Sequence, residues 1–354
     1  MKELLSGNIA LCKGAMWAGI DAYFGYPITP QNEIPEFFSY EMPKLNKIFV
    51  QSESEIAAAS MVMGAATTGK KVMTTSSSPG ISLMQETLSY MCGCELPAVF
   101  ANIARCGPGL GGIAPSQADY FQSVHSGGHG DYKLTVLAPA SAQETFDLTA
   151  MAFYLAFKYR NPVMILTDGL LGQMLEPVEN IAPSDKIFST NPFDTSSWTL
   201  SGAKDRKPRH IKSLFLNPIQ LEAHNLKLQA KYKKIAEEEV RYEEYQTDDA
   251  DYLIVAYGSS SRISKGAIEQ LRKKGKKIGM LRPITLSPFP SGWLINNASR
   301  FKNIVVMELS AGQMLVDVKC AVEGRTTVSF YGRMGGAVFT TEELVAEITK
   351  ICNL

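Results

Sequence analysis

The feature that most constrains the fold is the alternation of strand-like and helix-like segments through residues 1–170. Short apolar runs bounded by turn residues predict strands, and longer segments with helical periodicity separate them. The predicted strands are Tyr23–Tyr26, Lys47–Val50, Lys71–Ser76, Pro97–Ile103, Thr135–Ala138 and Pro162–Thr167; the predicted helices are Ile9–Gly19, Ile56–Thr67, Ile81–Met91 and Ala142–Phe157. Strands such as Val163–Leu166 are continuously apolar, as in a sheet covered on both faces. This half is therefore predicted to be a doubly wound α/β domain.

The pattern breaks after residue 171 and resumes near residue 251. Asn191–Asp205 is rich in Ser, Thr and Pro, and Lys204–Lys212 is basic. Leu221–Tyr245 contains no Gly or Pro and many good helix formers, so it predicts a long helix. Its apolar positions recur every seven residues, namely Leu221, Leu228, Ile235 and Tyr242. Such a stripe packs either on the parent protein or on a partner helix.

From Asp251 a second, smaller α/β unit is predicted. Its strands are Tyr252–Tyr257, Lys277–Leu281, Asn303–Glu308 and Val328–Tyr331, and its helices are Ser264–Lys274, Met314–Glu323 and Thr341–Ile351. A length of 354 residues agrees with two domains. We divide the chain into a domain over residues 1–195, a linker with a long helix over 196–249, and a domain over 250–354.

Composition excludes several classes of partner. The formal net charge is zero, so we expect no nucleic acid and no membrane surface as a partner. No signal segment and no apolar run of about 18 residues is evident, so a cytoplasmic protein is expected. The six cysteines are scattered, and Cys92-Gly93-Cys94 lacks the two-residue spacing of cluster ligands. His125 and His129 lie in a Gly-rich stretch, so no metal site is predicted in this chain.

Two segments carry residues suited to chemistry. The strand Tyr23–Tyr26 ends in Pro27-Ile28-Thr29-Pro30, where two prolines fix the backbone on either side of a small hydroxyl. Glu55 opens a helix of small and apolar residues. A carboxylate at that position is either a solvated charge favoured by the helix dipole or a buried acid kept for chemistry.

A set of short motifs extends these two segments over nearly the whole chain. They are Gly7–Ala10, Gly25–Pro30, Glu55 nine residues before Gly64-Ala65, Ser76–Leu83, Arg105 with Gly107–Gly112, Gly128–Tyr132, Val136–Pro139 and Val306–Met314. The set resembles the alpha subunit of the thiamine-diphosphate-dependent 2-oxoacid:ferredoxin oxidoreductases, and most of all the branched-chain (2-oxoisovalerate) type. No single motif is specific, but the set is.

The resemblance implies a pyrimidine-type thiamine-diphosphate-binding domain, followed by a smaller domain like the C-terminal domain of the transketolase superfamily. It assigns Glu55 as the catalytic acid that contacts the pyrimidine ring of the cofactor. It assigns Tyr26, Pro27 and Ile28 to the cofactor site beside it. Arg105, just past a strand, would hold the substrate carboxylate with its planar fork, and the Thr29 hydroxyl would bind the carboxylate or oxo group.

One expected motif is missing. Thiamine enzymes bind the diphosphate through Mg²⁺ with a Gly-Asp-Gly segment, whereas here Asp168-Gly169 follows Thr167. The resemblance therefore implies that a beta subunit supplies the diphosphate and Mg²⁺ site, and that gamma and ferredoxin-like subunits supply iron–sulfur clusters. Ferredoxin, coenzyme A and the 2-oxoacid would be the other partners, and this chain alone would be inactive.

Alternatives remain open at the level of sequence. The substrate could be pyruvate, 2-oxoglutarate or an aryl-pyruvate, because one sequence does not show which residues line the pocket. The chain could be a non-catalytic scaffold, although a scaffold has no need of a buried acid. A dinucleotide-dependent dehydrogenase is disfavoured, because Pro108 interrupts the Gly107–Gly112 loop and no apolar helix follows it directly.

Overall fold

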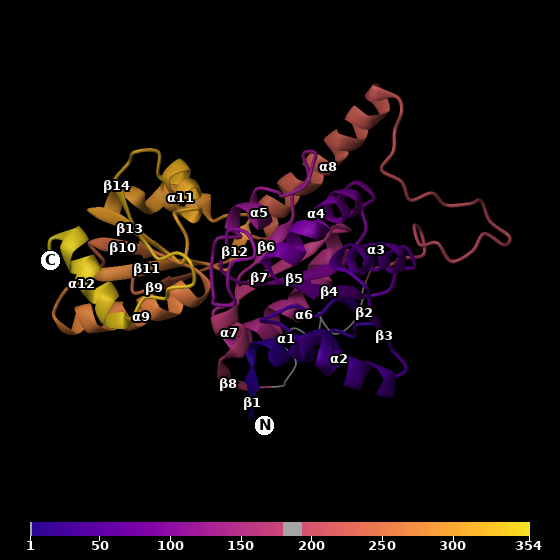
Figure 1. Cartoon of the computed structure of the whole chain (residues 1–354). Coiled ribbons are helices and arrows are strands. Elements are labelled where there is room, and N and C mark those ends of the chain that lie inside the picture. Colours follow the sequence, from indigo (N-terminus) through magenta and orange to yellow (C-terminus); the bar gives the residue numbers. More distant parts are fainter. Residues whose placement is uncertain (1, 180–192) are drawn as a thin grey trace.

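The computed structural model describes residues 2–179 and 193–354. They form two parallel-stranded sheets, each between layers of helices, which lie side by side with the N-terminal unit in indigo to magenta and the C-terminal unit in orange to yellow (Figure 1). This confirms the predicted order of two α/β units. The exact division at residues 195/196 and 249/250 stays a prediction, and the residues 180–192 before the first boundary lie outside the described part.

The first sheet has seven strands in the order β12-β6-β7-β5-β4-β2-β3. They are β2 (Ala22–Gly25), β3 (Ile48–Gln51), β4 (Val72–Ser76), β5 (Val99–Ala104), β6 (Thr135–Leu137), β7 (Val163–Asp168) and β12 (Thr285–Ser287). The strands β2 to β7 run parallel, and every residue of β4, β5 and β7 is buried. Continuous burial explains why these segments are apolar without alternation.

Helices cover both faces of this sheet (Figure 1). On one face lie α1 (Gly7–Trp17), α2 (Glu33–Lys44), α6 (Ala142–Tyr159) and α7 (Gly169–Gln173); on the other lie α3 (Glu55–Ala66), α4 (Ser78–Gly93) and α5 (Tyr120–Val124). A ribbon of β1 (Lys2–Ser6) and β8 (Leu175–Glu179), paired antiparallel, borders α1 and α6. None of the helices in residues 2–179 and 193–354 is long and apolar enough to cross a membrane.

The second sheet has the order β14-β13-β10-β11-β9. Its elements are β9 (Tyr242–Tyr245), β10 (Tyr252–Val255), α9 (Gly258–Lys273), β11 (Ile278–Pro283), α10 (Ser291–Asn297), a short 3-10 turn (Ala298–Arg300), β13 (Asn303–Glu308), α11 (Met314–Val322), β14 (Thr327–Gly332) and α12 (Thr341–Cys352). Strands β14, β13, β10 and β11 run parallel, and the edge strand β9 pairs with β11 antiparallel. The predicted C-terminal helix is confirmed, with a capping box between Thr340 and Glu343.

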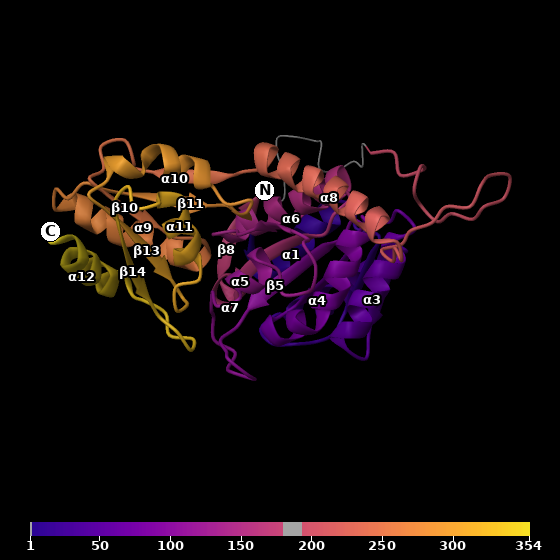
Figure 2. The same cartoon turned by 90° about the horizontal axis from the view of Figure 1, so that it is seen from above.

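The predicted long helix is shorter than the sequence pattern indicated. Helix α8 (Pro218–Glu238) runs from the far end of the first unit back toward the second, as both views show (Figures 1 and 2). Leu228 and Ile235 are buried against the parent protein, which decides between the two interpretations of the stripe. Tyr242 does not continue it, because Tyr242–Tyr245 pairs with β11 as a strand, and that pairing outweighs local helix propensity.

The two units are joined by buried polar contacts centred on Gln117, which is 3% exposed. Its side-chain Nε2 donates to the carbonyl of Tyr257 (2.9 Å), and its Oε1 accepts from Ser260 Oγ (2.5 Å) and from the backbone N–H of Leu309 (2.9 Å). Its own backbone N–H donates to the Leu309 carbonyl at 2.9 Å. One residue of the first unit thus bonds three residues of the second, two at the start of α9 and one after β13.

We predict that Gln117→Ala destabilises the protein by about 2–4 kcal/mol, because it leaves buried donors and acceptors of the second unit without hydrogen-bond partners. Urea unfolding of the purified protein measures the loss. The control is Gln229→Ala, which removes one bond to the Asp131 carbonyl at an exposed position and should cost less than about 0.5 kcal/mol. Equal losses in the two variants would contradict the role of Gln117.

Candidate active site

The site lies where the strand order of the first sheet reverses. The chain passes from β2 outward to β3 and then crosses back to β4 on the other side of β2. In open α/β sheets, ligands bind outside the carboxyl ends of the strands at such a point. The predicted residues all follow strands at this edge, with Tyr26–Thr29 after β2, Glu55 after β3 and Arg105 after β5.

Glu55 is the first residue of α3, and its side chain is buried at 8% exposure. The Ser54 side chain caps the helix by accepting from the N–H of Ala57, so the Glu55 carboxylate is not needed as a cap. It forms no hydrogen bond or ion pair with any residue of 2–179 or 193–354. The side chain is thus largely buried while its carboxylate stays available to a ligand.

Gly80, in the first turn of α4, makes room for this carboxylate. A Cβ atom built on Gly80 would lie 2.8 Å from Glu55 Oε1 and 2.0 Å from Ser76 Oγ. The hydroxyls of Ser76 and Ser77 are buried, and within the described residues neither has a hydrogen-bond partner. Buried hydroxyls are normally paired, so these two hydroxyls mark a polar region beside the carboxylate that the described residues leave unpaired.

Arg105 contacts the same first turn of α4 through Ser78. It is 9% exposed, and its Nη1 donates to the Thr29 carbonyl at 3.0 Å. Its backbone N–H donates to Ser78 Oγ at 2.9 Å. Its Nε is buried, and no partner for it occurs among the residues that the structure describes. The guanidinium therefore keeps one buried donor for a carboxylate.

The structure brings Thr29 and Arg105 together, but through the Thr29 carbonyl. The Thr29 hydroxyl faces outward and accepts a long bond of 3.4 Å from Asn32 Nδ2. Tyr26, Pro27 and Ile28 form the turn between β2 and Thr29, with Pro27 exposed and its neighbours half-buried. The exposed turn is thus open to a ligand or to another chain.

A cavity of about 580 Å³ opens beside Arg105, between the carboxyl edges of the two sheets. The first unit contributes Ser78, Pro79, Ser82, Arg105–Gly109, Ser116, Ala118 and Asp119; the second contributes Leu309–Ala311, Gln313, Met334 and Gly335. Arg105 is the one basic side chain among these lining residues. The cavity therefore offers one cation and several apolar surfaces.

Asp119 is the one acid in that lining. Its Oδ2 accepts from Ser78 Oγ (2.6 Å) and from Asn102 Nδ2 (2.8 Å). Burial raises the pKa of this carboxyl, and the two hydrogen bonds oppose part of that rise. Sequence reasoning missed Asp119, Asn102 and Ser78 as site residues, although the Ser76–Gly80 motif directly after a buried strand was a signal.

Within residues 2–179 and 193–354, the Gly107–Gly112 loop does not have the strand–loop–helix setting of a dinucleotide site. The Gly107–Gly112 loop leads to an isolated bridge between Arg105 and Pro115, and the next helix begins only at Tyr120. Asp168 is fully buried as a structural cap, whose carboxylate accepts from the N–H groups of Leu170 and Leu171. No group of three or more potential metal ligands occurs in the described residues.

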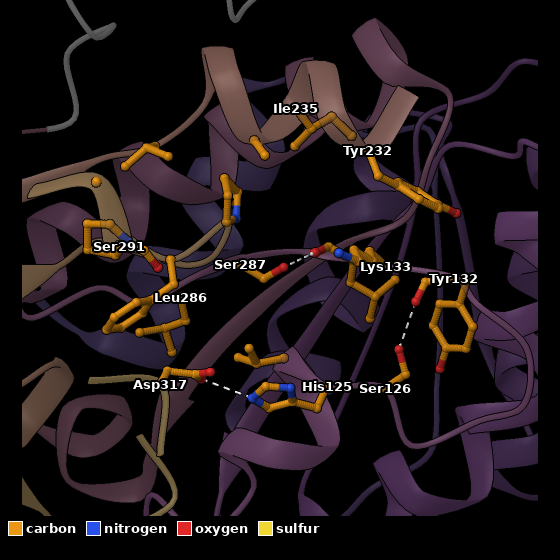
Figure 3. A pocket seen from close by; sticks show the side chains of 18 of the residues that line it. His125, Ser126, Tyr132, Lys133, Tyr232, Ile235, Leu286, Ser287, Ser291 and Asp317 are labelled. Atoms are coloured by element: carbon orange, nitrogen blue, oxygen red, sulfur yellow. Dashed lines mark hydrogen bonds and ion pairs between the residues drawn. The ribbon is translucent and has the colours of Figure 1, made fainter. Parts of the chain in front are cut away.

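A larger cavity of about 700 Å³ lies away from these residues, between α8, α10 and the segment around β6 (Figure 3). Its wall contains His125, whose Nε2 lies 2.9 Å from an Asp317 carboxylate oxygen, and apolar side chains such as Leu286 and Ile235 (Figure 3). None of the predicted site residues lines it. Size alone therefore does not identify the active site.

Comparison with known proteins decides the family. Residues 13–244 match the family described as pyruvate flavodoxin/ferredoxin oxidoreductase, thiamine diphosphate-binding. The chain belongs to this family. Residues 250–344 match the core domain II of pyruvate:ferredoxin oxidoreductase. The thiamine-type fold expected for the first unit is therefore confirmed.

Curated relatives share the full length of the chain. The ketoisovalerate oxidoreductase subunit VorB of Methanothermobacter thermautotrophicus is 48% identical over 99% of this chain and 98% of its own length. The 2-oxoglutarate synthase subunit KorA of Methanocaldococcus jannaschii is 36% identical, with 97% and 98% covered. The resemblance to the 2-oxoisovalerate type is thus borne out.

Solved structures agree on the fold. The chain superposes on the 2-oxoglutarate:ferredoxin oxidoreductase from Magnetococcus marinus, solved with 2-oxoglutarate, coenzyme A and succinyl-CoA bound, with a TM-score of 0.84 and 25% identity. It covers 65% of that longer chain and 99% of its own length. A split-gene transketolase, at 13% identity and a TM-score of 0.56, shares the fold.

We predict opposite effects for two glycine-to-alanine changes in neighbouring helices. Gly80→Ala should destabilise by about 1–3 kcal/mol, because its Cβ meets Ser76 and Glu55. Gly64→Ala in α3, where no atom lies within 4 Å of the new Cβ, should stabilise by about 0.5–1 kcal/mol. Urea unfolding of the two variants measures both, and a neutral Gly80→Ala would contradict the tight packing.

Proposed function

We propose that this chain is the alpha subunit of a complex that oxidatively decarboxylates 2-oxoisovalerate to its acyl-CoA and reduces ferredoxin. The observation that carries this proposal is a pair of residues, Glu55 and Arg105, that both contact the first turn of α4. There the unpartnered carboxylate of Glu55 lies against Gly80, and the backbone N–H of Arg105 donates to Ser78 Oγ, while its guanidinium is held at the Thr29 carbonyl. Similarity to a ketoisovalerate oxidoreductase subunit supports the substrate class.

Glu55 is proposed as the acid that contacts the cofactor. Thiamine diphosphate, when bound, supplies the carbon nucleophile that attacks the oxo group. The Glu55 carboxyl would hydrogen-bond its pyrimidine ring from a largely buried position at the start of α3. Tyr26, Pro27 and Ile28 would form the adjacent wall. Glu53, two residues away, is exposed and takes no part.

Arg105 and Thr29 are proposed as the substrate-binding pair. The free Nε donor of Arg105 points to a carboxylate as its partner, since an arginine offers parallel donors to such a group. The hydrogen bond from Arg105 Nη1 to the Thr29 carbonyl fixes the guanidinium beside the turn that bears the Thr29 hydroxyl. The substrate carboxylate would lie there until it leaves as carbon dioxide.

The cavity lining favours a branched-chain 2-oxoacid over 2-oxoglutarate. A second carboxylate would call for a second cation, whereas Arg105 is the one basic group in the described lining. Pro79, Leu309 and Met334 present apolar surface that suits an isopropyl group. The 2-oxoglutarate class remains the second candidate, because the KorA relatives share full length with this chain.

Partner chains would complete the enzyme. The described residues contain no group suited to Mg²⁺ and no cluster motif, so we assign the diphosphate and Mg²⁺ site to a beta subunit. Gamma and ferredoxin-like subunits would carry electrons from the cofactor to ferredoxin. The complex would act in the cytoplasm and use coenzyme A as the acyl acceptor. A scaffold role is disfavoured, because a scaffold gains nothing from an unpartnered buried acid.

The proposal predicts that Arg105→Ala lowers kcat/KM for 2-oxoisovalerate by about 10–100-fold in the assembled complex, from losing a charged hydrogen bond of about 1.5–3 kcal/mol. Viologen reduction with coenzyme A present measures the rate. Arg325→Ala, a remote half-exposed arginine paired with Glu323, is the control and should leave the rate unchanged. Unchanged kinetics in Arg105→Ala would rule the assignment out.

For the acid, Glu55→Gln should nearly abolish turnover while the complex still assembles. The amide keeps the shape of the side chain but is not ionisable, so it does not serve as a proton-exchanging partner. Glu53→Gln is the matched control, with an exposed acid two residues away. Near-normal turnover in Glu55→Gln would defeat the proposed role.

The same assay, run with a panel of 2-oxoacids, tests the substrate. Fastest reduction with 2-oxoisovalerate is expected. A preference for 2-oxoglutarate would support the second candidate substrate instead. A purified complex that contains no thiamine diphosphate and shows no activity would contradict the proposed function.

A further inference from the structure

A closed ring of hydrogen bonds links the end of β5 to the start of α4. The Arg105 N–H donates to Ser78 Oγ (2.9 Å), and Ser78 Oγ donates to Asp119 Oδ2 (2.6 Å). Asn102 Nδ2 also donates to Asp119 Oδ2 (2.8 Å), and Asn102 Oδ1 accepts from the Ser78 N–H (3.0 Å). The ring thus begins and ends at Ser78, and Arg105 joins it through its backbone N–H.

Asp119 is the acceptor on which this ring closes. Both donors, one from β5 and one from α4, end on the same carboxylate oxygen, so its removal would leave two donors without an acceptor. Asp119 comes from neither element, since it precedes α5. It therefore ties the start of α4 to the end of β5 just beyond the point where the β4–β5 ladder ends, at Ser76 and Asn102.

The position of the ring gives it a consequence for the site. Arg105 directly follows β5, and Ser78 is two residues before Gly80, against which Glu55 packs. Asn102 is fully buried, and the ring lies at the wall of the 580 Å³ cavity. A shift of the ring would move the guanidinium relative to the cofactor acid.

We propose that Asp119 is a positioning residue for the 2-oxoacid, which acts through Ser78 and Asn102 to hold Arg105 in its carboxylate-binding geometry. This inference rests on the proposed substrate role of Arg105. It requires an acceptor oxygen at position 119 and no proton transfer by that group. Side-chain amide and carboxylate differ in charge but share that oxygen.

The test is a set of variants in the assembled complex, assayed by viologen reduction. Asp119→Ala should raise KM for 2-oxoisovalerate by about 10-fold, in the range expected for losing a buried charged hydrogen bond, with KM for coenzyme A unchanged. Asp119→Asn should stay within about threefold of the wild type, because its amide oxygen can still accept both donors. Ser78→Ala should resemble Asp119→Ala, since it opens the same ring.

A double-mutant cycle then separates this role from general damage. If Asp119 acts through Arg105, the double variant Asp119→Ala/Arg105→Ala should be no worse than Arg105→Ala alone, within about threefold, whereas independent effects would multiply. Should Asp119→Ala fail to assemble, the Ser78→Ala/Arg105→Ala cycle tests the same ring. Ser89→Ala is the matched control, because Ser89 of the same helix bonds the His129 carbonyl outside the ring.

The outcomes distinguish this inference from the proposed function. No effect of Arg105→Ala alone would overturn the proposed substrate site and this inference with it. A strong effect of Arg105→Ala with multiplicative losses in the cycle, or with an equal rise in KM for coenzyme A, would overturn this inference alone. Loss of activity in Asp119→Asn equal to that in Asp119→Ala would likewise overturn it, because the acceptor oxygen would not be what matters.

Discussion

The Gln117 side chain is the contact on which the shape of the site depends. It is buried between the two units and bonds three residues of the second one, Tyr257, Ser260 and Leu309. Because a buried amide without partners would be costly, the two units are held in one relative position. That position sets the carboxyl edge of the first sheet against that of the second, and the cavity beside Arg105 lies between them.

The first turn of α4 organises the chemistry within that frame. Gly80 lets the Glu55 carboxylate pack closely, and Ser78 bonds the backbone of Arg105. One turn of helix thus sets the distance between Glu55 and Arg105. Buried polar groups of this kind are costly unless they are paired, so the hydrogen bonds between them specify the geometry of this turn. The groups that remain unpaired are those that a ligand would meet.

The groups around Glu55 and Arg105 agree with a chain that is one subunit of a larger enzyme. The family to which it belongs binds thiamine diphosphate, and no group of three or more potential metal ligands occurs in the described residues. The exposed Tyr26–Thr29 turn and the unpartnered groups around Glu55 are where a second chain would complete the site. Relatives named for different 2-oxoacids share this framework, so substrate choice falls to the side chains that line the cavity.

Sequence alone determined the two α/β units and their parallel strands, because apolar periodicity is a local property. The candidates Glu55 and Arg105 came from the set of short motifs and the family that this set resembles. It did not reveal β12, a three-residue strand, or that Tyr242–Tyr245 is a strand, since both exist only through pairing with β6 and β11. Asp119 and Asn102 were likewise invisible, because only the fold brings them to Ser78. Tertiary structure decided which polar residues are buried together, and burial is what gives them their role.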